Sequence, residues 1–125
     1  MSDALKRLID AVEAGSIRSK FDPAFERAIY PQVNAMSTVY LAGEAYCGSL
    51  DAAKDLHEAL LPGWRCEINW KPGEAADACV SNGSGDEIEW GDAQQSASAA
   101  RTWLLAILRA KLSEAKNHPR QETSV

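Results

Sequence analysis

The hydrophobic pattern of this chain changes its period at Trp64, and this change limits the folds open to it. Before Trp64, apolar residues recur every three to four positions, as at Leu5, Leu8 and Ile9, which is typical of amphipathic helices. From Trp64 to Lys71, apolar and polar residues alternate, which is typical of a strand with one solvated face. A helical half followed by a short sheet favours an α+β fold.

Helix-boundary residues divide the chain outside the alternating segments. Asp22 followed by Pro23 is typical of an N-cap and a first helical residue, and Pro31 predicts an early end to that helix because a proline disfavours helical geometry in the residue before it. Ser49 is expected to cap a further helix that ends at Pro62. The helical segments are expected over about residues 3–14, 23–30, 32–46, 50–61 and 97–115.

Three short strands are predicted after Trp64, the second with Ala78 and Val80 facing the core and the third with Ile88 and Trp90 facing it. Short turns between successive strands make an antiparallel meander. We therefore expect a single α+β domain over residues 1–116, with a three-stranded antiparallel β-meander packed with about four α-helices. Residues 117–125 are polar, and we expect a disordered tail there.

Several residues are assigned to packing. The small residues Ala42, Gly43 and Ala45 would let another part of the backbone approach closely. The last helix has a broad apolar face, which is expected to pack against both the sheet and the N-terminal helices. The four tryptophans are interpreted as anchors between sheet and helices in preference to a ligand cage: Trp64, Trp70, Trp90 and Trp103.

The charge and the cysteines exclude several classes. The 125 residues carry a formal net charge of −5, unlike a nucleic-acid binder, so no direct nucleic-acid partner is expected. No stretch approaches the roughly 18 apolar residues of a membrane span, and the N-terminus does not resemble a signal peptide, so we expect a cytoplasmic protein with no membrane partner. Cys47, Cys66 and Cys79 lack the paired spacing of a zinc site or disulfide framework.

No motif in the sequence indicates catalysis, and we expect no catalytic residue, no metal site and no cofactor. The two histidines, His57 and His118, stand outside any recognised motif. A nucleophilic pair of Cys47 and His57 would need a third group and an oxyanion hole that the sequence does not indicate. The chain is therefore expected not to be an enzyme.

Acidic residues gather in the predicted sheet. Glu67, Asp77, Glu87 and Glu89 could all project from its solvated face, with Asn69 nearby. Such a face can serve solubility and protect the sheet edges, or it can bind a partner. The second interpretation makes these five residues a partner-binding surface for a protein with a basic surface. The sequence leaves both interpretations open.

Two segments resemble parts of small bacteriophage and prophage proteins of unknown function. The first runs from Ser49 through Leu60-Leu61-Pro62-Gly63-Trp64, and the second is Ala100–Ala110. Together they are similar to a helix ending in Leu-Pro-Gly-Trp, a small sheet and a final helix, as in phage ABA sandwich domain proteins. The resemblance covers roughly the second half of the chain. It implies a phage setting, and hence the cytoplasm of a host cell, but no reaction.

Our first hypothesis is a non-enzymatic phage or prophage accessory protein that binds a host protein. Its specific form is an inhibitor of a host defence nuclease complex, similar to an anti-CRISPR protein. An alternative is a homo-oligomeric structural or assembly component of a phage. A second alternative is a small-ligand-binding protein or an enzyme of unknown reaction, which would need a pocket joining His57, a cysteine and a carboxylate.

Overall fold

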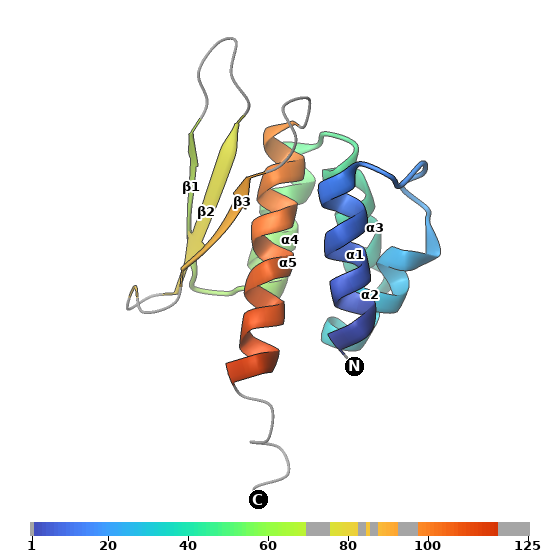
Figure 1. Ribbon diagram of the computed structural model, residues 1–125, viewed down its shortest axis with the longest axis horizontal. Helices are drawn as coiled ribbons and strands as arrows, with labels where there is room; N and C mark the ends of the chain where they lie inside the picture. The colour runs from blue at the N-terminus through green and yellow to red at the C-terminus, as the bar shows by residue number, and fades with distance from the viewer. Residues whose placement is uncertain (1, 70–75, 83–84, 86–87, 93–97, 118–125) are drawn as a thin grey trace, which may run out of the picture.

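The computed structural model describes residues 2–69, 76–82, 85, 88–92 and 98–117 (Figure 1). Its three strands form one antiparallel sheet in the order β1-β2-β3, which confirms the predicted α+β fold with an antiparallel meander. Five helices lie in the described part of the chain, one for each expected helical segment, although the predicted fold counted only about four. The elements are α1 (Ser2–Ala14), α2 (Pro23–Val33), α3 (Met36–Tyr46), α4 (Leu50–Leu60), β1 (Arg65–Asn69), β2 (Asp77–Ser81), β3 (Ile88–Asp92) and α5 (Ala99–Asn117).

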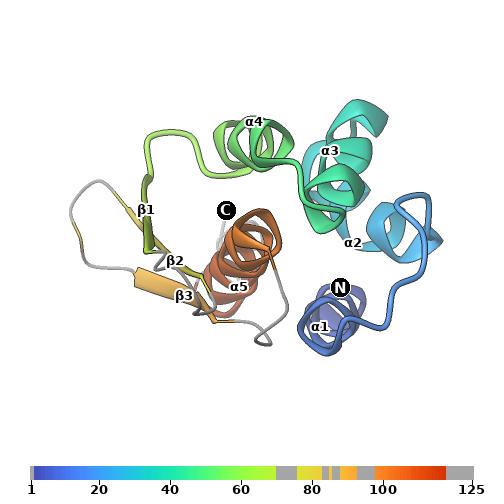
Figure 2. The ribbon, with the colours of Figure 1, turned by 90° about the horizontal axis from the view of Figure 1, so that it is seen from above.

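Helix α5 is the centre of the molecule. It packs against β2 and β3 on one side and against α1, α3 and α4 on the other, as expected from its broad apolar face (Figure 2). Every residue from Leu104 to Leu108 is buried, so this helix is covered all round at its middle. Helix α5 covers one face of the sheet, and none of the other described helices packs on the opposite face (Figure 2).

Helix α2 continues beyond Pro31 to Val33, so the predicted early end of this helix is wrong. A proline removes one N–H from the helix, and the exposed position of Pro31 lets water satisfy the carbonyl that loses its partner. The helix ends instead at Asn34, which adopts the left-handed conformation with φ 58° and donates its amide to the Tyr30 carbonyl. This longer α2 is the reason that α3 starts at Met36 and not near residue 32.

The predicted helix starts at Asp22 and Ser49 are confirmed. The Asp22 carboxylate accepts a hydrogen bond from the Ala24 amide at 2.9 Å, and the Ser49 hydroxyl accepts one from the Ala52 amide at 3.1 Å. None of the described helices has the length and apolar content needed to cross a bilayer. Helix α5 extends to Asn117, and the rest of the predicted tail lies outside the described residues.

Gly43 on α3 confirms the prediction of a close backbone approach. A Cβ atom at this position would overlap the backbone carbonyl of Lys20, in the link between α1 and α2. The same link is held by Tyr46, whose hydroxyl donates to the Ile17 carbonyl at 2.9 Å. The link between the first two helices is therefore fastened to α3 at two points.

Candidate functional site: the outer face of the sheet

The two faces of the sheet differ in what covers them. Residues directly opposite each other in antiparallel strands share a face, and Ala78 and Val80 of β2 are fully buried on the face that α5 covers. The alternate positions belong to the other face, which we call the outer face. The residues of this face whose side chains the structure describes are Arg65, Glu67, Asn69, Asp77, Cys79, Ser81, Ile88 and Trp90.

The predicted orientation of β3 is wrong. Ile88 pairs with Ser81 and Trp90 pairs with Cys79, so both apolar side chains lie on the outer face. Ile88 is 50% exposed and Trp90 is 49% exposed. Of the three described tryptophans, Trp64 and Trp103 pack against the core as expected, whereas Trp90 does not. Trp70 lies outside the described residues.

The reason for this orientation is the close packing of α5 on the sheet. On the inner face, Ala78 of β2 lies opposite Gly91 of β3, which makes this the smallest cross-strand pair in the sheet. Placing Trp90 inward would put an indole on the face that α5 covers, beside this small pair. Gly91 lies two residues after Glu89 and therefore on the same face of β3. This small residue is the sequence signal that could have indicated which face of β3 packs against a helix.

The five predicted partner-binding residues do not share one face. Glu67, Asn69 and Asp77 lie on the outer face, where the Asn69 amide donates to the Asp77 carboxylate at 3.0 Å. Glu89 pairs with Val80, which places it on the face that α5 covers. Glu87 lies outside the described residues. Of the predicted acidic residues that the structure describes, Glu67 and Asp77 thus lie on the outer face, together with two apolar side chains that the prediction had placed inside.

A shallow hollow of about 320 Å³ lies on the outer face. One cross-strand row, Glu67–Cys79–Trp90, crosses it from one edge strand to the other. Partial burial, with the neighbouring charges of Glu67 and Asp77, raises the pKa of the Cys79 thiol. The hollow therefore presents a neutral thiol on the central strand, with an indole on one edge strand and a carboxylate on the other.

His57 is part of the packing between α4 and α5. Trp103 donates its indole N–H to Nδ1 of His57 at 3.1 Å, so the ring proton lies on Nε2, which donates to the Trp64 carbonyl at 3.0 Å. Both ring nitrogens are thereby occupied, and neither is available to activate Cys47. Within the described ranges, no group of three or more histidine, cysteine, aspartate or glutamate side chains could hold a metal ion.

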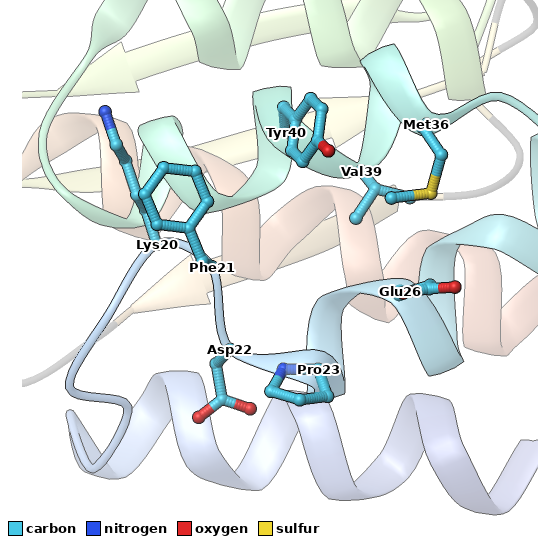
Figure 3. A pocket seen from close by; sticks show the side chains of 8 residues that line it. All are labelled: Lys20, Phe21, Asp22, Pro23, Glu26, Met36, Val39 and Tyr40. Atoms are coloured by element: carbon cyan, nitrogen blue, oxygen red, sulfur yellow. The ribbon is translucent and has the colours of Figure 1, made fainter.

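A second hollow lies at the opposite end of the molecule, between α2, α3 and the link before α2 (Figure 3). The ring of Phe21 meets that of Tyr40 edge to face, with 6.3 Å between centroids, and the Lys20 ammonium lies 5.5 Å from the Phe21 centroid. The hollow measures about 180 Å³. Pockets for small organic ligands usually measure roughly 300–1,000 Å³. This hollow is thus small for such a ligand, and the outer face is the stronger candidate.

Comparison with protein-family models, with curated proteins and with solved structures finds no match to this chain.

Proposed function

We propose that this chain is a non-enzymatic phage or prophage accessory protein that binds a host protein through the outer face of its sheet. The observation that carries the proposal is the half-exposed indole of Trp90, which lines the hollow on that face from the edge strand β3. Tryptophan is enriched among residues that dominate binding energies, because a large rigid ring loses little conformational entropy on binding. Ile88, two residues away on the same strand, enlarges the apolar surface.

The position of these side chains on a strand supports binding without rearrangement. Trp90 is held in the sheet by pairing with Cys79, and its carbonyl accepts a hydrogen bond at 2.8 Å from Arg109 of α5. Arg109 in turn forms an ion pair with Glu13 of α1 at 3.4 Å. An anchor fixed in this way needs little ordering when a partner arrives, which favours affinity.

Charge complementarity favours a partner with a basic surface. Glu67 lines the hollow and Asp77 lies on the same face of the sheet, and the whole chain carries a net charge of −5. Such a charge attracts cationic proteins over distances up to about a Debye length, roughly 8 Å at physiological salt. Nucleases have cationic surfaces where they bind phosphates, so an inhibitor of a host defence nuclease complex is the specific form of the proposal.

The test compares two aromatic positions of equal exposure. Immobilised wild-type chain, Trp90→Ser and Tyr40→Ser are incubated with bacterial lysate at low and high salt. Tyr40 is 50% exposed and lies on α3, at the other end of the molecule from the sheet, so its variant is the matched control (Figure 2). Captured proteins are identified by mass spectrometry, and each is purified and titrated against the three chains.

The proposal expects a basic protein whose dissociation constant rises by about tenfold or more with Trp90→Ser and changes less than about twofold with Tyr40→Ser. A Glu67→Lys variant should also weaken the complex, most strongly at low salt. A partner that binds all variants equally, or loses affinity only with Tyr40→Ser, would contradict the assignment of the outer face.

A further inference from the structure

Strand β1 is an open edge of the sheet. It pairs with β2 on one side, and four of its five residues are exposed. The other edge strand, β3, differs because α5 packs closely along it and Arg109 occupies the carbonyl of Trp90. An exposed edge of this kind can accept a further strand, since its backbone N–H and C=O groups on that side have no ladder partner in the part of the chain that the structure describes.

The charges along β1 have no opposite charge across the sheet. Arg65 lies opposite Ser81, and Glu67 lies opposite Cys79, so the directly facing residues on β2 are uncharged. Arg65 and Glu67 are two residues apart and both project from the outer face. If a second β1 strand runs antiparallel to the first, this spacing allows Arg65 of one copy to face Glu67 of the other.

The register between the two β1 strands decides whether the charges that face each other attract or repel. In the arrangement considered, a two-fold axis normal to the sheet passes through one residue of β1. That residue then faces the same residue of the second copy, and the outer faces of both copies lie on the same side. An axis at Arg65 or at Glu67 places two like charges opposite each other. An axis at Cys66 instead places Arg65 of each copy opposite Glu67 of the other, twice.

We propose that two copies of this chain pair through β1 about a two-fold axis at Cys66, so that two three-stranded sheets join into one continuous sheet. The occupant of the open edge is thus a second copy of the same chain. Ile68, which is partly exposed on the inner face of β1, lies opposite residue 64 of the second copy in this register. The outer faces of the two copies become coplanar. The pairing does not depend on the host partner proposed above.

The test is a charge exchange on purified protein, read by sedimentation equilibrium over a range of concentrations. In the proposed register, Arg65→Glu places glutamates opposite each other, and Glu67→Arg places arginines opposite each other. The double variant R65E/E67R restores opposite charges at both contacts. Lys6→Glu, an exposed position on α1, changes the net charge as much as Arg65→Glu does and serves as the control. Circular dichroism verifies that each variant is folded.

The expected result is a wild-type dimer whose dissociation constant rises at least about tenfold in each single variant, returns to within about threefold of wild type in R65E/E67R, and is unchanged by Lys6→Glu. An equimolar mixture of the two single variants should also form dimers. A wild-type chain that stays monomeric at millimolar concentration would overturn the proposal. So would a dimer that is insensitive to the single variants, or one that R65E/E67R does not restore.

Discussion

Trp103 on α5 donates its indole N–H to Nδ1 of His57 on α4, across 3.1 Å. The same imidazole donates from Nε2 to the carbonyl of Trp64, just before β1 begins. One buried side chain therefore joins the central helix, α4 and the start of the sheet. His57 fixes where the chain turns from helix to strand, which is the point where the hydrophobic period changes.

Replacing His57 by leucine should lower the free energy of unfolding by about 2 kcal/mol, because the Trp103 N–H and the Trp64 carbonyl would both lose their partner at a partly buried position. Urea unfolding followed by circular dichroism measures this change. Lys54→Ala on the exposed side of the same helix removes a surface ion pair with Glu58 and should leave the free energy of unfolding close to that of wild type. Equal stability of His57→Leu and wild type would contradict the structural role of the histidine.

Gly43→Ala should destabilise the fold by about 1–3 kcal/mol, since the new methyl group would overlap the Lys20 carbonyl and push the link off α3. The comparison is Ser37→Ala, at an exposed position of the same helix, which is expected to change the unfolding free energy by less than about 0.5 kcal/mol. Thermal unfolding of the two variants separates the outcomes. A Gly43→Ala protein as stable as Ser37→Ala would show that this link is free to move.

The tryptophans should divide into two classes on substitution. Trp103→Ala removes a ring packed against the core together with its bond to His57, and should cost at least about 2 kcal/mol. Trp90→Ala removes a half-exposed ring and should cost no more than about 1 kcal/mol. Guanidinium unfolding of both variants measures the difference. If the two losses are equal, Trp90 is a packing residue and not a free binding surface.

Alkaline pH should weaken the fold through Cys66. Burial, followed by the neighbouring Cys79 and Glu67, raises the pKa of the Cys66 thiol from 9.0 to about 11. The protonated Cys66 thiol makes its full contribution to the free energy of unfolding below pH 9. This contribution is lost as pH rises through 11, because the thiol ionises at lower pH in the unfolded chain than in the folded one. The free energy of unfolding of wild type, relative to that of Cys66→Ala, should therefore decrease as the pH is raised from 9 to 11. A difference that stays constant with pH would contradict the shift.

Sequence reasoning worked where one local signal decides the structure. The helix starts at Asp22 and Ser49 depend on a capping side chain and its neighbouring amides, and both were predictable. Gly43 was likewise identified because a glycine within a run of small residues indicates a close approach. The antiparallel meander followed from alternation and short turns.

The errors arose where tertiary packing decides between local alternatives. Pro31 could end a helix or lie in its last exposed turn. It lies in the last turn of α2, because the helix ends at the C-cap residue Asn34. The alternation of apolar and polar residues predicts that β3 is a strand, but it does not predict which of the two alternating sets of side chains faces the core. Which set faces the core depends on the packing of α5 against β2 and β3, which is a tertiary contact. This single shift moved Trp90 outward and Glu89 inward, and so changed the composition of the candidate site.

Hydroxyl-radical footprinting of the chain, free and bound to the host protein captured as described above, tests the role of the outer face most directly. The method reports the solvent exposure of each aromatic and aliphatic side chain. Trp90 and Ile88 should lose most of their reactivity on binding, while Phe21 and Tyr40, which are exposed on the helical end, should keep theirs. Protection of Phe21 and Tyr40 with Trp90 still reactive would contradict the assignment of the binding surface to the sheet.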